Sequence, residues 1–356
     1  MGNLLKFSAL VTKVKAMEGK LLKPAQYQQL ITMRSVVELF SFLKADAAYS
    51  HSLGAINENA VHRGDIEKLL IQSLYHDYAK LYSFSGLEER KYLKLYLHHL
   101  EVDLINYCLR IISNHYQEPF DLGYKKDFFD CYSEISVDKL TSSGSIGQLV
   151  ENLQGSIYYQ PLSAIRDKEH TTLFDYDLTL NLFCYSYVWQ QRHKVLTTKE
   201  KNNFIKEWGT KIDLLNLQWI YRAKKYFLMS PEHIYTIIIP IHYRLPKEIF
   251  KALVEASSID EYFKILATTS YQKHYQEKAS EPFDQMYYEA LAYLFRVNQR
   301  QNPYSIAAVN NYLFKKEAEI NRIITILECI RYDLSPSERA AYANLTVSER
   351  ASYTSG

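Results

Sequence analysis

The sequence predicts an all-α protein built from three structurally similar helical domains. Apolar residues recur at helical spacing over long stretches, alternating strand patterns are scarce, and glycine and proline fall where the periodic stretches end. Three segments also share one pattern, a serine followed three residues later by Glu or Gln and then by apolar residues one turn apart. The serines are Ser35, Ser145 and Ser258. Each copy predicts a capping box, in which the serine hydroxyl accepts a first-turn amide and the Glu or Gln reaches back to the serine amide.

Residues on both sides of these serines extend the repeat. A leucine stands five positions before each serine and a tyrosine ends each segment, as Leu30 and Tyr49, Leu140 and Tyr159, and Leu253 and Tyr271. A polar motif follows downstream, as Asp103-Leu104-Ile105-Asn106, Asp213-Leu214-Leu215-Asn216 and Glu319-Ile320-Asn321-Arg322. Both elements keep their order and recur about every 110 residues, although chance recurrence of common residues is the alternative explanation. We expect units at 1–123, 124–232 and 233–340, and a mobile tail at 341–356.

The helices expected in the first unit follow from apolar stripes and their end signals. An apolar and basic stretch at 4–17 and a stretch opened by Pro24 precede the capping box at Ser35. A long helix is expected at about 59–83. Ser85 and Glu88 predict a capping box that opens a second long helix, which ends before Pro119.

The second and third units give similar signals. An apolar stretch at 174–195 predicts a helix, and Thr197 with Glu200 predicts the capping box of the next one. Ser230 followed by proline predicts a helix start with proline in the first turn. Further prolines open the helices of the third unit, at positions 246, 282 and 303, and the last helix is expected to end near residue 333.

Composition indicates a globular protein without a large basic face. Of the 356 residues, 47% are hydrophobic and 23% are charged, and the length favours two or three domains. A net charge of +2 is too small to predict nucleic acid or anionic lipid as a partner, and the basic run at 222–225 is most simply solvated helix surface. Four dispersed cysteines favour a reducing compartment, the cytosol. No signal peptide is expected, and no apolar run approaches the roughly 20 residues of a membrane span, so we expect membrane association only through a partner.

The sequence offers one weak candidate for catalysis. It contains no phosphate-binding loop, no zinc-binding HExxH motif and no nucleophile elbow. His76 and Asp77, with His51 and Asp138, could supply the ligands of an HD-type metal phosphohydrolase, but the adjacent pair also fits the polar side of its helix. Two functions therefore stay open from the residues alone, a metal phosphohydrolase and a helical scaffold protein. No cofactor is expected.

Polar side chains of the repeated motif are the candidates for a partner interface. Three related units can close around a pseudo-threefold axis, and residues at matching positions would then surround that axis. The candidates are Asp103, Asn106, Arg110, Asp213, Asn216 and Arg322. Ordinary surface exposure is the alternative explanation.

Two stretches near the ends of the chain resemble a known family. The run from Lys15 to Leu22, the following Tyr27-Gln28-Gln29-Leu30 and the capped segment to Tyr49 are similar to the start of the C subunit of bacterial and archaeal V/A-type rotary ATPases, called the d subunit in eukaryotes. The run Phe314-Lys315-Lys316-Glu317-Ala318-Glu319-Ile320-Asn321 resembles the closing motif of that family. The similarity spans nearly the whole chain, and it departs in the third unit, where Glu319 and Arg322 replace Asp and Asn.

The resemblance implies a funnel-shaped protein of three helical domains around a pseudo-threefold axis, with no reaction of its own. Such a protein would lie on the cytoplasmic face of the cell membrane, on the ring of c/K-type proteolipid subunits that carries sodium ions or protons. The lower end of the central rotor shaft would enter its socket, lined by the helix faces that carry Asp103, Asn106 and Arg110 and those that carry Asp213 and Asn216. Its function would be to transmit torque between ATP hydrolysis or synthesis and ion transport.

Overall fold

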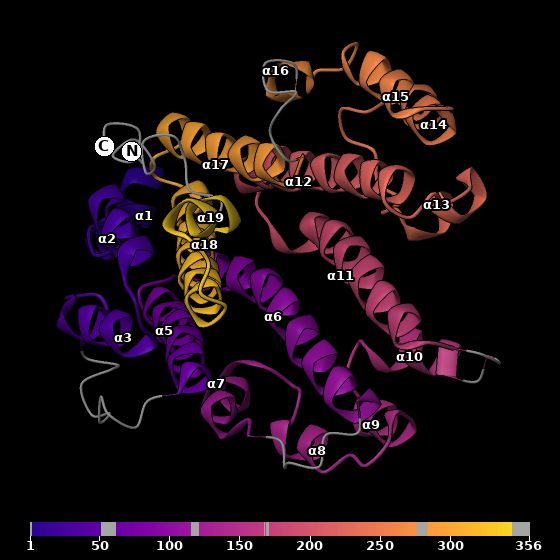
Figure 1. The fold of residues 1–356 in the computed structure, drawn as a ribbon. Helices are drawn as coiled ribbons and strands as arrows, with labels where there is room; N and C mark the ends of the chain where they lie inside the picture. The colour runs from indigo at the N-terminus through magenta and orange to yellow at the C-terminus, as the bar shows by residue number, and fades with distance from the viewer. Residues whose placement is uncertain are drawn as a thin grey trace. The chain divides into compact units, whose positions relative to one another are not determined.

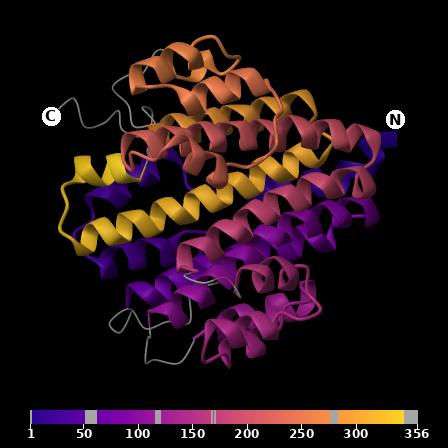
Figure 2. The ribbon, with the colours of Figure 1, turned by 90° about the vertical axis from the view of Figure 1, so that its right-hand side faces the viewer.

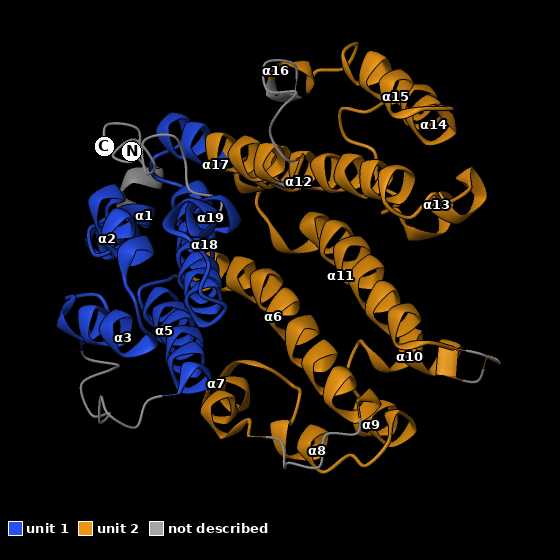
Figure 3. Cartoon of the chain, in the orientation of Figure 1, with its two compact units in different colours: residues 1–85, 295–356 blue, residues 86–294 orange. Residues whose placement is uncertain are grey.

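A computed structural model describes residues 2–50, 62–114, 121–166, 168, 171–275 and 283–343 (Figure 1). All regular secondary structure in these ranges is helical, which confirms the all-α prediction. The chain forms two compact units (Figure 3), one comprising 1–85 and 295–356 and the other comprising 86–294. Both ends of the chain therefore belong to the same unit.

The unit that contains the chain ends is built around one long helix, α18 (Ile306–Arg331). Its other helices are α1 (Gly2–Glu18), α2 (Pro24–Thr32), α3 (Val36–Ala45), α5 (Arg63–Ser83), the end of α17 (Phe283–Gln301) and α19 (Pro336–Tyr342). α18 packs against α1, α2, α3, α5 and α19, and both its apolar residues and several polar ones are buried. A helix surrounded on most sides in this way buries polar side chains as well, and these need internal partners.

The unit formed by 86–294 has two long neighbouring helices, α6 (Leu87–Ser113) and α11 (Leu173–Val195), and α11 also packs on α12 (Thr198–Lys225). Figure 2 shows these long helices along their length. The unit also contains short helices, namely α7 (Gly123–Tyr132), α8 (Val137–Thr141), α9 (Ile146–Asn152), α10 (Tyr159–Arg166), α13 (Pro231–Ile237), α14 (Lys247–Glu255), α15 (Ile259–Leu266) and α16 (Gln272–Tyr275). α8 and α9 pack on α6, and α13 and α15 pack on α12.

The three predicted capping serines begin helices with nearly identical geometry. Their backbone φ and ψ angles are −144° and 158° at Ser35, −149° and 160° at Ser145, and −146° and 164° at Ser258. Each hydroxyl accepts the amide three residues later, at 3.1, 3.2 and 3.1 Å. The predicted return bond to the serine amide is wrong in all three copies. The Glu or Gln side chain instead accepts the amide of the residue before the serine, at Arg34, Gly144 and Ser257.

Some predicted helix ends differ from the structure. Gly86 is the N-cap of α6, because Ser85 donates its hydroxyl to the carbonyl of Leu81 and so belongs to the end of α5. Thr197 is the N-cap of α12 but makes no side-chain capping bond. Ser335 caps α19, which extends to Tyr342 within the predicted tail. Residues 59–61, 282 and 344–356, which include the start of one predicted helix, one helix-opening proline and most of that tail, lie outside the described residues.

All four cysteines are free thiols. Cys108, Cys184 and Cys329 are buried, as expected for small apolar side chains, whereas Cys131 is exposed. Burial raises the pKa of Cys108 and of Cys184 to about 12, so both stay protonated at neutral pH.

Candidate functional site

Three buried tyrosines each donate a hydrogen bond to a carboxylate on a long helix. The pairs are Tyr49 with Glu319 of α18 at 2.5 Å, Tyr158 with Glu101 of α6 at 2.7 Å, and Tyr271 with Asp213 of α12 at 2.7 Å. We call them the first, second and third clamp. Each tyrosine lies shortly after one of the three serine-capped helices, so each clamp fixes the end of a capped helix to a long helix.

Each clamp carboxylate also binds the segment that leads into the short helix before the capped one. Glu319 accepts the amide of Leu22 at 2.6 Å, Glu101 accepts the hydroxyl of Ser133 at 2.5 Å, and Asp213 accepts the amides of Tyr243 and Arg244 at 3.2 and 2.7 Å. These segments precede α2, α8 and α14. In each clamp, a single acidic residue therefore holds both the segment before the first short helix and the tyrosine after the second, capped one.

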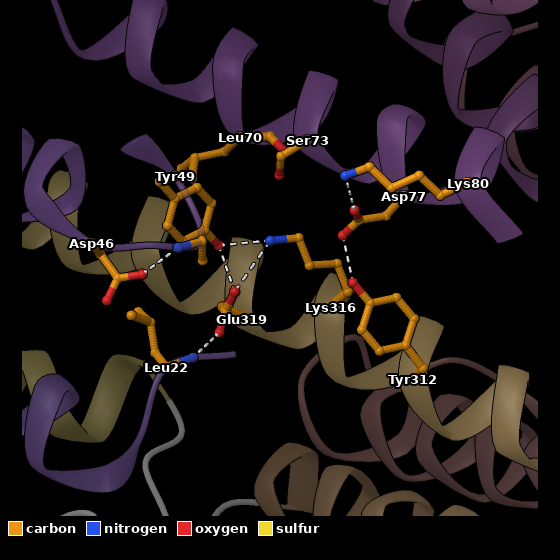
Figure 4. A network of polar contacts seen from close by, with 11 residues as sticks. Leu22, Asp46, Tyr49, Leu70, Ser73, Asp77, Lys80, Tyr312, Lys316 and Glu319 are labelled. Atoms are coloured by element: carbon orange, nitrogen blue, oxygen red, sulfur yellow. Dashed lines mark hydrogen bonds and ion pairs between the residues drawn. The ribbon is translucent and has the colours of Figure 1, made fainter. Parts of the chain in front are cut away.

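A buried lysine completes the first clamp (Figure 4). Lys316 lies one turn before Glu319, and their side chains are only 3% and 2% exposed. The ammonium donates to the Tyr49 hydroxyl at 2.9 Å and to Glu319 Oε1 at 3.2 Å. Burial and the neighbouring carboxylate raise the pKa of Tyr49 well above its usual value, so the phenol remains a donor. Loss of Lys316 or of Glu319 alone would leave the other charge buried without compensation.

A histidine takes the equivalent position in the second clamp. His98 lies one turn before Glu101, and its Nδ1 is 2.9 Å from Glu101 Oε2 and 3.2 Å from the Tyr158 hydroxyl. Burial alone would raise the pKa of Glu101, but hydrogen bonds and charge from His98, with hydrogen bonds from Ser133 and Tyr158, hold it below its usual value. Glu101 is therefore the ionised acceptor of this clamp.

The third clamp has no basic side chain at this position. Thr210, which is buried and uncharged, lies one turn before Asp213. Burial raises the pKa of Asp213 despite hydrogen bonds from Arg244, Tyr271 and Tyr243 that oppose the shift. The residue one turn before the carboxylate is thus Lys, His or Thr in the three clamps, and the electrostatic support of the carboxylate differs accordingly.

The clamps are sites of mechanical attachment. In each clamp the tyrosine hydroxyl and the carboxylate are buried and hydrogen-bonded to one another. Among the described residues, no group of three or more His, Cys, Asp or Glu side chains is placed to hold a metal ion. Hydrogen bonds to charged groups contribute about 1.5–3 kcal/mol each, so three clamps make a substantial contribution to holding the short helices in place.

The structure places the six predicted interface residues in three kinds of environment: buried, exposed and half-buried. Asp213 and Asn216 are buried and hold the segment before α14, since Asn216 donates to the Ile239 carbonyl at 2.9 Å and accepts the Ile239 amide at 2.8 Å. Asn106 is buried as well. Asp103 and Arg110 are exposed on α6, and Arg322 is half-buried with its guanidinium over the Tyr27 ring. Partner contact by these six residues stays a prediction.

Sequence reasoning missed two of the clamp residues. The repeated pattern points to Asp103 and Tyr159, whereas Glu101 and Tyr158 form the second clamp. Positions two apart on a helix point in nearly opposite directions, so Glu101 is buried while Asp103 faces solvent. A signal was present, because both Tyr158 and Tyr271 stand 13 positions after their capping serines.

The proposed phosphohydrolase ligands find other roles or lie out of reach. Asp77 accepts hydrogen bonds from Tyr312 and from Lys80, as Figure 4 shows, and His76 is exposed. Asp138 forms an ion pair with Lys126. His51 falls outside the described residues. This geometry gives the metal-enzyme alternative no support.

An open groove of about 690 Å³ lies in the unit formed by 86–294, between α11 and α12. Phe174 and Asp177 of α11, Trp219 and Arg222 of α12, and Phe227 after α12 are among its lining residues. The groove is largely apolar, and the two phenylalanines are 59% and 67% exposed. Exposed aromatic side chains beside an apolar groove are typical of a protein-binding surface.

None of the described helices is long and apolar enough to span a lipid bilayer. This finding applies to the described parts of the chain only.

Comparison with known proteins gives one consistent result. The family model described as ATP synthase (C/AC39) subunit matches residues 10–342. A protein of Archaeoglobus fulgidus, named as the C subunit of an A-type ATP synthase, is 24% identical over 346 residues, which cover 95% of each chain. Proteins of the same name from Methanocaldococcus jannaschii and Thermococcus kodakarensis are 22% and 24% identical, covering 92% and 91% of this chain and 83% and 86% of theirs.

Proposed function

Because this chain belongs to the ATP synthase (C/AC39) subunit family, we propose that it is the non-catalytic central-stalk subunit of a V/A-type rotary ATPase. In this role it seats the rotor shaft on the membrane ion-carrying ring. It transmits torque between ATP hydrolysis or synthesis and ion transport. It acts on the cytoplasmic face of the cell membrane and contacts the membrane through the ring.

The observation that carries this proposal is the set of three clamps. A subunit that transmits torque must resist deformation, because elastic deformation between its two interfaces would absorb part of the rotation instead of transmitting it. Each clamp joins two short helices to a long helix through one buried carboxylate, with partners at 2.5–3.2 Å. Buried polar networks whose members are all bonded make structures rigid.

The clamps also support a three-domain arrangement around a pseudo-threefold axis. The same local geometry recurs three times, so three helix clusters of common design are expected to repeat about an axis. We propose that the clusters are α2, α3, α5 and α18; then α6 with α8 to α11; and then α12 with α14, α15 and α17. The first cluster joins both chain ends, unlike the continuous range 1–123 expected from the sequence.

Exposed Asp103 and Arg110 are the candidates for direct contact with the shaft or ring. Asp213 and Asn216 are buried and make no direct contact with a partner in this proposal. They affect the partner-binding surface only by holding the segment from Ile239 to Arg244 in place.

The experiment that tests the proposal compares complexes assembled with and without this chain. Membranes that lack it should retain ATP hydrolysis by the detached catalytic head, while ATP-driven ion transport into vesicles is lost. Addition of the purified chain should restore transport, whereas addition of chain that has been heat-denatured should not. Full ion transport in the absence of this chain would contradict the proposed role.

A further inference from the structure

Resting on the proposed function, we propose that the groove between α11 and α12 binds one helix of the coiled-coil rotor shaft. The groove is lined on α11 from Phe174 to Asn181, a length of about 10 Å or two helical turns. A groove of this length accepts the apolar side chains of two turns of a partner helix, spaced three and four residues apart.

The charges along the groove favour a coiled-coil helix over a purely apolar partner. Arg222 lines the groove, is exposed, and has no hydrogen bond or ion pair to its guanidinium from the described residues. Asp177 also lines the groove. Its pKa is raised by burial, against the opposing effects of Arg110 and Asn181, so its carboxylate is incompletely compensated. Helices of coiled coils carry both acidic and basic residues beside an apolar seam, and such a helix can satisfy Arg222 and Asp177 together.

The chain that follows α12 supports contact at the same end of the groove. Tyr226, Phe227 and Leu228 are 62%, 67% and 84% exposed. Leu228 also has a φ of 48°, a left-handed conformation that is costly for a leucine. Three consecutive exposed apolar residues, one of them in a strained conformation, are typical of a surface that a partner covers.

Binding of the full-length chain to the purified shaft subunits tests this inference. The double variant Phe174→Ser/Phe227→Ser should weaken shaft binding by about tenfold or more, and Arg222→Glu should do the same, with an effect that is largest at low salt. Tyr332→Ser is the matched control, because Tyr332 is 68% exposed and lies outside the groove. It should bind as the unchanged chain does.

The possible outcomes separate the inference from the proposed function. If the unchanged chain binds the shaft and the groove variants bind within twofold of it, the groove assignment is overturned while the function stands. If the groove variants lose binding to the purified membrane ring or to anionic lipid vesicles but keep shaft binding, the shaft is the wrong occupant. If the unchanged chain binds neither shaft nor ring, the proposed function itself fails. Thermal unfolding and circular dichroism of each variant establish that its fold is retained.

Discussion

Tyr49 and Glu319 are 270 positions apart in the sequence, yet their side-chain oxygens lie 2.5 Å apart in a buried site. This bond joins the first capped helix to the last long helix and ties both chain ends into one compact unit. In the other two clamps the carboxylate helix precedes the capped helix in the sequence. In the first clamp the carboxylate helix α18 lies near the end of the chain and the capped helix α3 near its start. The order is therefore the same only if the repeat is read on from the last helices of the chain to the first.

Removal of a clamp hydroxyl should destabilise the protein. Tyr158→Phe leaves Glu101 without one of its donors, and we expect the free energy of unfolding to fall by about 1.5–3 kcal/mol. Tyr159→Phe is the matched control, because Tyr159 is half-buried and its hydroxyl has only a 3.4 Å contact with Gln154; its effect should stay within about 0.5 kcal/mol. Urea denaturation of both variants measures the difference, and equal losses would argue against the clamp.

The buried ion pair of the first clamp should behave as one unit. Lys316→Met leaves Glu319 buried without its cation, and we expect a loss of about 3–5 kcal/mol. Adding Glu319→Gln removes the uncompensated charge while keeping an acceptor for Tyr49, so the double variant should be more stable than Lys316→Met alone. A double-mutant cycle from denaturation curves gives the coupling energy. Simple additivity of the two changes would show that the charges are independent.

Glu101 and Asp213 should give opposite pH dependences. The pKa of Glu101 is held below its usual 4.5, so this group contributes stability above that pH and the contribution is lost as pH falls through the lowered pKa. The pKa of Asp213 is raised above its usual 3.8, so its protonated form is favoured in the folded chain and its contribution grows as pH falls through the raised pKa.

Denaturation between about pH 3 and pH 6 measures this difference, because the slope of stability against pH reports proton uptake on unfolding. Glu101→Gln should make the loss of stability on acidification shallower than in the unchanged chain. Asp213→Asn should make it steeper, because the compensating proton uptake by the folded chain is removed. The same change of slope in both variants would contradict the different environments of the two carboxylates.

Gly209 should not tolerate a side chain. A Cβ at this position of α12 would lie 2.5 Å from Tyr243 Cγ and 2.9 Å from its Cβ. Those atoms are close to the backbone that Asp213 holds in place, so the ring cannot move away freely. Alanine favours a helix over glycine by about 1 kcal/mol, yet we expect Gly209→Ala to destabilise the protein by about 1–3 kcal/mol.

The double variant Gly209→Ala/Tyr243→Ala tests the cause of that loss. Alanine at position 243 removes the ring atoms but keeps the Cβ at 2.9 Å, so Gly209→Ala should cost less stability in the Tyr243→Ala background than in the unchanged chain, as measured by thermal unfolding. If Gly209→Ala is instead more stable than the unchanged chain, the close approach of Tyr243 has no energetic consequence.

Much of the local structure could be predicted from the sequence. Ser35, Ser145 and Ser258 were correctly predicted as helix starts, because a capping bond joins residues only three positions apart. Some local predictions are wrong, among them the return bond of the three capping boxes and the cap at Ser85, whereas the residues misplaced in the second clamp concern long-range contacts. The repeated pattern points to Asp103 and Tyr159, whereas Glu101 and Tyr158 form the second clamp, because the face of a helix or turn that becomes buried depends on what packs against it.

The sequence by itself determined the helices, their capped starts and the threefold recurrence of the pattern, because these depend on periodicity and on bonds between near neighbours. Only the tertiary structure decided which carboxylate meets which tyrosine, and that the first such pair joins opposite ends of the chain. A buried hydrogen bond forms where packing brings two polar groups together away from water, and separation along the chain gives no information about that distance.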